Sequence, residues 1–178
     1  MSQEWLSRTA TRAMCLPAVV ERACGYRFDD FARRRVFEPL GMARTGYWSG
    51  PDPHPPGAEP FWPADQPVPL SLGDGGVWTT LQDLMRWNDA FAHDEPGVTE
   101  LMSTLGRLDD GTVLHYAWGF GIPLRRGQPV HSAGGNVPGM TGTLRRVPHS
   151  GRGIAVLTET DGVERILRLT DHLVDRFW

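Results

Sequence analysis

The stretch HSAGGNVPGM, residues 131–140, decides the fold of this 178-residue chain. Before it, residues 116–123 (YAWGFGIP) alternate large and small side chains, and this period of two predicts a strand with one bulky face. After it, residues 141–147 and 153–158 are apolar and β-branched, and turn residues fill 148–152. Connections this short predict an antiparallel meander, because a parallel pair needs a crossover of a dozen or more residues.

The Gly134-Gly135 step inside this stretch has two interpretations. Glycine lets a backbone approach another group closely, which suits a binding site. Glycine also marks bulges and tight bends in strands. The residues by themselves favour a bulge or a bend.

Composition limits the chemistry that the chain can perform. All 18 basic residues are Arg, so no lysine base, Schiff base or phosphate-loop lysine can come from these residues. The net charge of -3 predicts no nucleic-acid partner. No C-x-x-C or H-E-x-x-H spacing occurs, so we expect no metal site, and nothing indicates a cofactor. No apolar run suits a membrane span or a signal peptide, and the sequence as written predicts a cytoplasmic protein with no membrane partner.

Helices are predicted on both sides of the strand region. One begins near residue 13 and ends at Gly25, and a second covers about 28–37. Thr80 with Asp83 resembles a capping box that opens a third helix. Helical turns are expected at 98–103, a hairpin turn at 109–111, and a C-terminal helix from about 163 to 177. Apolar residues, including Leu169 and Leu173, cover more than half of this last helix, which predicts tight packing on the sheet.

Two segments differ from the rest of the chain. Residues 1–12 are polar and weakly patterned, and we expect them to be poorly ordered. Residues 50–69 contain eight prolines, which predicts a long irregular loop, with Phe61 and Trp62 holding it to the body. A disordered linker is the alternative interpretation of this loop.

Four motifs in a fixed order resemble one enzyme family. They are FEPLGMARTG at 37–46, GDGGVWTT at 73–80, YAWGFG at 116–121, and the Gly-Gly stretch. Their order and spacing resemble the serine hydrolases of the class C β-lactamase type, which include D-alanyl-D-alanine carboxypeptidases, D-aminopeptidases and esterases. The resemblance covers residues 13–178 and implies an α+β fold, a truncated β-lactamase/transpeptidase-like domain. About three strands of an antiparallel sheet, a C-terminal helix and part of a helical region would be retained.

The resemblance also implies a catalytic apparatus that these residues lack. Family members carry a nucleophilic Ser and a Lys in S-x-x-K, a Tyr in Y-x-N, and a K-T-G or H-x-G strand beside the oxyanion hole. Without Lys, S-x-x-K is absent from the 178 residues. Counting from the helix near residue 13 places Arg8 and Ala10 where Tyr and Asn are expected. Residues 1–12 therefore look like a non-family start, and 13–178 like the C-terminal part of a single domain.

The third motif can be aligned in two ways. Alignment on His131 makes it a remnant of H-x-G but requires two extra residues before Gly139. Alignment on the glycines places Ala133 at the family's His position, and we favour it because it needs no insertion in a strand. His131 is then an ordinary strand residue. The resemblance marks Ser132, Ala133, Gly134 and Gly135 as candidate substrate-binding residues, and no complete catalytic set is found.

These observations predict a fragment of a serine hydrolase that acts on amide or ester bonds, in a β-lactam, a D-amino-acid peptide or an ester. The chain alone is expected to be inactive. Two alternatives stay open, a non-catalytic peptide- or penicillin-binding pseudoenzyme and a complementing half of a split enzyme. The expected partners are a small-molecule or peptide substrate and either a second copy of the chain or a missing N-terminal half. The resemblance leaves export of longer relatives open.

Overall fold

A computed structural model describes residues 15–48, 72–73, 75–137, 139–148, 150–160 and 162–178. The predictions for residues 1–12 and 50–69 lie outside the described residues. The chain divides into two compact units, residues 1–83 and 84–178, and the boundary falls inside helix α3 (Leu81–Ala92). Each unit is described by itself.

The first unit begins with two helical segments at the predicted places. Residues 15–24 form a helix that ends at Gly25, whose φ of 75° and hydrogen bond to the Glu21 carbonyl (2.8 Å) complete the expected cap. The second segment combines α2 (Phe28–Ala32) with a single π-helical turn, η1 (Arg33–Phe37). Two helical segments therefore precede the Pro-Leu-Gly sequence that follows Glu38.

A short antiparallel pair and a buried carboxylate complete the first unit. Strand β1 (Gly46–Tyr47) pairs with β2 (Val77–Trp78), a pair that the sequence did not predict. Asp83 is fully buried and accepts hydrogen bonds from the Arg44 amide (2.8 Å) and the Thr45 hydroxyl (2.9 Å). The Asp83 amide donates to the Thr80 hydroxyl (3.2 Å), which is the N-terminal half of the predicted capping box.

The second unit is built on a five-stranded antiparallel sheet in the order β3-β4-β7-β8-β9. Its three long strands are β7 (His131–Val137), β8 (Met140–Arg146) and β9 (Gly153–Thr158). They form the predicted meander, so the α+β fold class is confirmed. Helix α4 (Thr99–Ser103) lies at the predicted place, and β5 (Leu124–Arg125) pairs with β6 (Gln128–Pro129) in a separate hairpin.

The Gly-Gly step does not form a bulge, so that prediction was wrong. Gly134 pairs with Thr143 and Gly135 with Gly142, in an uninterrupted register that runs from one end of β7 to the other. The chain turns after Val137 instead, where Gly139 has a φ of 79°. Both glycines therefore belong to a regular strand.

The YAWGFG segment is a hairpin rather than one strand, so the prediction of a single strand over residues 116–123 was wrong. Strand β3 (Tyr116–Ala117) and strand β4 (Phe120–Gly121) pair across a two-residue turn. Trp118 and Gly119 have φ values of 36° and 98°, the left-handed conformations that such a tight turn requires. Trp118 is 65% exposed while Phe120 is buried, so the large residues do not share one face.

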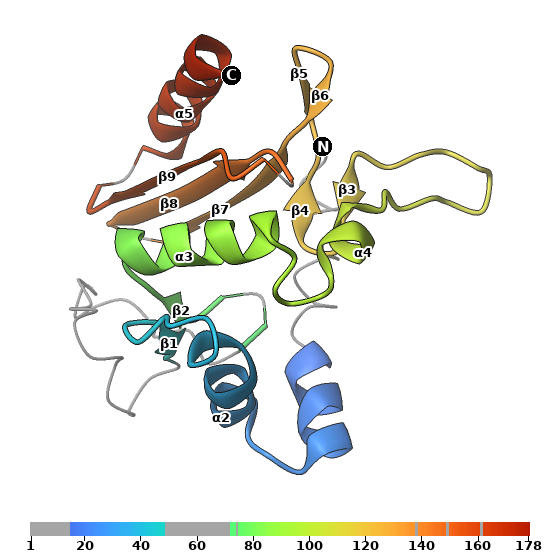
Figure 1. The fold of residues 1–178 in the computed structure, drawn as a ribbon, viewed down its shortest axis with the longest axis vertical. Helices are drawn as coiled ribbons and strands as arrows, with labels where there is room; N and C mark the ends of the chain where they lie inside the picture. Colours follow the sequence, from blue (N-terminus) through green and yellow to red (C-terminus); the bar gives the residue numbers. More distant parts are fainter. Residues whose placement is uncertain (1–14, 49–71, 74, 138, 149, 161) are drawn as a thin grey trace. The chain divides into compact units, whose positions relative to one another are not determined.

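Helices cover both faces of the long strands in the second unit (Figure 1). Helix α5 (Val163–Phe177) packs on one face, where the Arg145 guanidinium lies 3.5 Å from the Asp171 carboxylate. The part of α3 that belongs to this unit contacts the opposite face through Asn88 and Phe91. The Asn88 amide donates to the Gly151 carbonyl (3.0 Å), in the turn before β9. The sheet is thus the middle layer of this unit.

The C-terminal helix has a narrower buried stripe than its sequence predicts. Ile166, Thr170 and Val174 are buried, whereas Leu169 and Phe177 are 46% and 66% exposed. Burial follows a stripe of one residue per turn because the sheet contacts only that side. Among the described residues, none of the helices combines the length and the apolar character that a membrane crossing requires.

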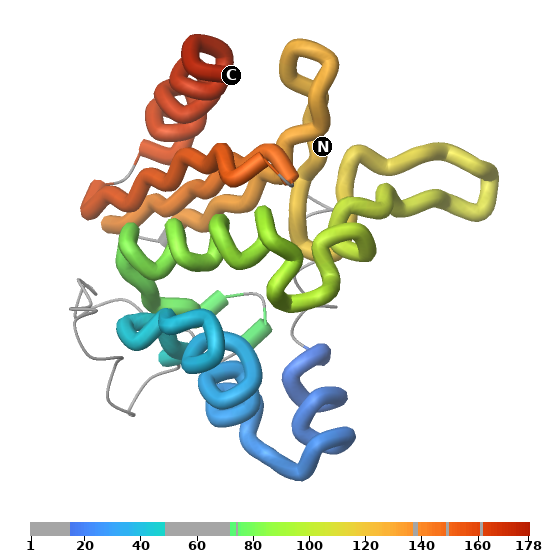
Figure 2. The backbone as a smooth tube through the Cα atoms, viewed as in Figure 1, coloured from blue at the N-terminus to red at the C-terminus, as the bar shows by residue number. Residues whose placement is uncertain are grey.

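The backbone trace shows a long loop near residue 110 that projects beyond the sheet (Figure 2). Arg107 and Val113 form an isolated bridge across this loop, and the Thr112 amide donates to the Asp110 carboxylate (2.8 Å). Gly111 has a φ of 85°. The predicted hairpin turn at 109–111 is therefore confirmed.

A substitution at Gly153 tests the contact between α3 and the sheet. A Cβ at this position would lie 2.5 Å from the Asn88 side-chain oxygen, and Asn88 is buried and held by Gly151. Gly153→Ala should therefore lower the free energy of unfolding by about 1–3 kcal/mol. Gly135→Ala, whose Cβ would meet nothing within 4 Å, is the control and should change it far less. Equal effects in urea denaturation would contradict the proposed contact.

Candidate functional site

Strand β7 carries all five residues that the sequence marked as candidates, from His131 to Gly135. One side of β7 is fully paired with β8. On its other side, β4 pairs with it at Ser132 alone, and within the described part of the second unit no strand pairs beyond that point. Gly134, Gly135 and Asn136 are exposed. The C-terminal half of β7 is therefore an accessible strand edge.

The two glycines of this edge have different surroundings. A Cβ at Gly134 would lie 3.2 Å from the Gly142 carbonyl oxygen, closer than an ordinary contact. A Cβ at Gly135 would meet nothing within 4 Å, so open space lies beside its backbone. Gly134 thus serves packing against β8, and Gly135 leaves room for an approaching group.

His131 lies at the other end of β7 and is buried. It is 1% exposed, and its ring stacks on Phe120 with centroids 5.1 Å apart. It shares a strand face with Ala133, which packs against the Ala117, Phe120 and Ile122 cluster. The structure therefore places His131 within the fold, away from the accessible part of the edge.

A chain of hydrogen bonds fixes the tautomer of His131. An Arg146 Nη2–H group lies 3.1 Å from His131 Nδ1, and a guanidinium can only donate, so Nδ1 is the acceptor. The proton of the neutral ring must then be on Nε2, which lies 3.0 Å from the Ser103 hydroxyl oxygen. Ser103 in turn donates to the Thr99 carbonyl (2.7 Å).

The direction of these bonds is opposite to the one that activates a serine. A nucleophilic serine donates its proton to a histidine lone pair. Here the Ser103 hydroxyl donates its hydrogen bond to the Thr99 carbonyl, and the Nδ1 lone pair of His131 accepts a hydrogen bond from Arg146. The Ser103–His131 pair is therefore a structural contact in this arrangement rather than a nucleophile and its base.

Arg146, a hydrogen-bond partner of His131, is a buried arginine. It is 1% exposed, and its guanidinium carbon lies 3.7 Å from the Phe91 ring centroid and 4.8 Å from that of Phe120. Its Nε and Nη1 atoms have no hydrogen-bond partner within the described part of the chain. Burial lowers the pKa of Arg146 to about 10, because the charged form loses its hydration.

Sequence reasoning missed both Ser103 and Arg146. Arg146 could have been found, because an antiparallel register that starts at His131 places Arg146 directly opposite. Ser103 lies 28 residues before His131 on a separate short helix, and no spacing rule connects the two. Among the described residues, no three His, Cys, Asp or Glu side chains gather as a metal site requires.

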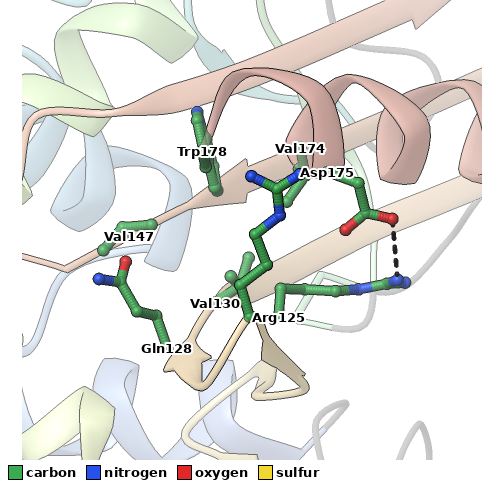
Figure 3. A pocket seen from close by; sticks show the side chains of 8 residues that line it. Arg125, Gln128, Val130, Val147, Val174, Asp175 and Trp178 are labelled. Carbon is green, nitrogen blue, oxygen red and sulfur yellow. Dashed lines mark ion pairs between the residues drawn. The ribbon is translucent and has the colours of Figure 1, made fainter.

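Two hollows are lined by described residues of the second unit and bear on the site. The larger, here called the α4 cavity, has a volume of about 470 Å³. Its lining comprises Glu100, Ser103, Ile122, Gln128, Pro129, His131, Val147, Pro148, Ser150 and Arg152. The smaller is a crevice of about 10 Å³ between the β5–β6 hairpin and the end of α5, where Arg125 forms an ion pair with Asp175 (Figure 3). That crevice has space for about one water molecule.

Arg146 makes stability depend on pH in a predictable direction. Its folded-state pKa of about 10 lies below the ordinary value of an arginine, so in alkaline solution the unfolded chain binds the proton more tightly. Folding stability therefore rises as pH rises through 10. Relative to Arg146→Met, the wild type should gain about 1 kcal/mol in free energy of unfolding between pH 8 and 10.5, measured with urea. Arg165→Met is the control, because it removes an exposed arginine of α5 instead of a buried one. If the stability of the wild type relative to Arg146→Met falls between pH 8 and 10.5, the assignment is refuted.

Comparison with known proteins extends these observations. Residues 4–175 match the family model described as Beta-lactamase. The matched range begins inside residues 1–12, which lie outside the described residues. A search of curated proteins finds no match.

Three solved structures have a similar fold. A penicillin-binding protein homologue from Pyrococcus abyssi is 20% identical, with 93% of this chain and 41% of that chain covered and a TM-score of 0.67. A penicillin binding protein from Bacillus halodurans is 22% identical, with 89% and 52% covered and a TM-score of 0.67. A Beta-lactamase/D-alanine Carboxypeptidase from Yersinia pestis is 14% identical, with 94% and 54% covered and a TM-score of 0.68. The chain thus spans about half the length of these proteins.

Proposed function

Because the chain belongs to the β-lactamase family, we propose that it forms the C-terminal part of a serine hydrolase that cleaves amide or ester bonds. The substrate class is a β-lactam, a D-amino-acid peptide or an ester. Similar structures include the D-alanine carboxypeptidase from Yersinia pestis and a D-amino acid amidase from Ochrobactrum anthropi, and these support the class.

The observation that carries the proposal is the accessible edge of β7 at Gly135. An extended substrate can pair with an exposed strand edge through its main chain, because the edge offers backbone donors and acceptors. Open space beside Gly135 allows that approach, and Gly134 keeps the strand close to β8. This chain would supply one wall of a substrate cleft.

The proposal includes inactivity of the 178 residues by themselves. They contain no Lys, so the S-x-x-K pair of the family cannot come from them. The Ser103 hydroxyl donates to the Thr99 carbonyl, and the His131 nitrogen that faces Ser103 carries the ring proton, so it cannot accept the serine proton. Nucleophile and base would then be contributed by a segment outside these residues.

Two further candidate functions use the same accessible edge, and they differ in whether the bound substrate is hydrolysed. In one, the chain binds peptides or penicillins without hydrolysing them. In the other, it complements a separate chain that carries S-x-x-K. Calorimetric titration with a D-Ala-D-Ala peptide separates them: binding by the chain alone favours the binding module, while hydrolysis on adding an S-x-x-K chain favours complementation.

Covalent labelling tests the inactivity directly. We expect no adduct with a β-lactam or a fluorophosphonate probe in intact-mass spectrometry, because no serine of the described part is paired with an available base. A catalytically active family enzyme serves as the positive control. Stoichiometric labelling of Ser132, Ser103 or Ser71 would refute the proposal and identify a different nucleophile; Ser71 lies outside the described residues.

Self-association is the second expected property of the chain alone. The outer edge of β9 has no strand partner within the described residues of its unit, and Gly153–Thr158 contains neither a charge nor a proline. Uncharged edge strands promote pairing between copies. Light scattering after size-exclusion chromatography should give a dimer or a larger species. A monodisperse monomer with a cooperative melt above roughly 55 °C would contradict this, because ordinary domains melt near that temperature.

A further inference from the structure

We propose that the α4 cavity binds a small zwitterion with an apolar body, such as a free amino acid with a large apolar side chain. This site is separate from the accessible edge at Gly135, because it lies at the His131 end of β7. The inference therefore does not depend on the proposed hydrolase function.

The cavity has the size of a small-molecule site, and its lining includes both buried and exposed residues. Its volume of about 470 Å³ falls within the range of about 300–1,000 Å³ that is typical of ligand pockets. Ile122 and His131 are 3% and 1% exposed and form its buried end. Val147, which is half-buried, and Pro129, which is exposed, add apolar surface to the lining. An apolar side chain would lose water-exposed surface on entering.

The buried end accepts a neutral group and disfavours a charged one. The Ser103 hydroxyl and His131 Nε2 are bonded to each other, so neither is a free ionic partner. Arg146 donates to His131 Nδ1, so that ring nitrogen is also occupied. Arg146 lies behind His131 and does not line the cavity, so a ligand carboxylate or ammonium would lose its hydration there without touching a counter-charge. The ligand's apolar end therefore points inward.

The exposed rim of the cavity carries one acidic and one basic side chain, and these two do not form an ion pair with each other. Glu100 comes from α4 and Arg152 from the turn before β9, and both are exposed and line the cavity. In the described part of the chain, neither side chain forms an ion pair, with the other or with any residue. A ligand that carries an ammonium and a carboxylate on one carbon would place the ammonium toward Glu100 and the carboxylate toward Arg152.

The test uses ligands that remove one charge at a time. Leucine and phenylalanine are titrated into the 178-residue chain and followed by ligand-observed NMR, beside their amides, which lack the carboxylate, and their N-acetyl derivatives, which lack the ammonium. Both free amino acids should bind saturably, and each derivative should bind about tenfold more weakly. No saturable binding, or equal binding of all three forms, would overturn the proposal.

Variants assign the two charges to residues. Glu100→Gln should weaken amino-acid binding about tenfold and leave binding of the N-acetyl form unchanged, and Arg152→Gln should do the same with the amide form unchanged. Glu159→Gln and Arg165→Gln, exposed and outside the cavity lining, are the matched controls. Gln128→Trp, at an exposed rim position, should block binding in a chain whose circular dichroism is unaltered. Binding that is indifferent to all three cavity variants would overturn the assignment.

Discussion

The buried guanidinium of Arg146 is the constraint on which the second unit depends. It lies between the Phe91 ring of α3 and the Phe120 ring of β4, so one cation joins a helix to the sheet. Its bond to His131 Nδ1 fixes the tautomer of that ring and so the direction of the bond to Ser103. A buried charge whose Nε and Nη1 atoms have no hydrogen-bond partner among the described residues is costly, and the aromatic faces offset part of that cost. Removing His131 or Phe91 would leave the same charge with even fewer partners.

Much of the fold could be predicted from local sequence rules. The strands β8 and β9, the helix α5 and the cap at Gly25 follow from periodicity and from glycine, which act over a few residues. The YAWGFG hairpin could not be predicted from alternation, because Trp118 adopts a left-handed conformation that non-glycine residues rarely occupy. The exposed side of α5 was also missed, since periodicity gives the width of an apolar stripe but not the area of sheet that covers it.

The candidate site was predicted in part. The glycines of β7 were identified from sequence, but their separate roles depend on the distance to Gly142, which only the pairing register determines. The interpretation of His131 as a strand residue agrees with its burial, yet its partners come from α4 and β8. The α4 cavity could not be predicted at all, because its lining comes from segments between residues 100 and 152 that no motif connects.

The contact between Asn88 and Gly151 also has a consequence for the order in which the second unit assembles. It joins residues 63 positions apart, whereas the pairs of the β7–β8–β9 meander are separated by 17 positions or fewer. Closing the longer loop costs about 1 kcal/mol more in chain entropy. Low sequence separation favours early formation, so the meander can form as a local unit while the ends of its strands are still close along the chain. We therefore expect α3 to dock afterwards and bury Arg146, so that the cost of dehydrating that charge is incurred when the sheet already exists.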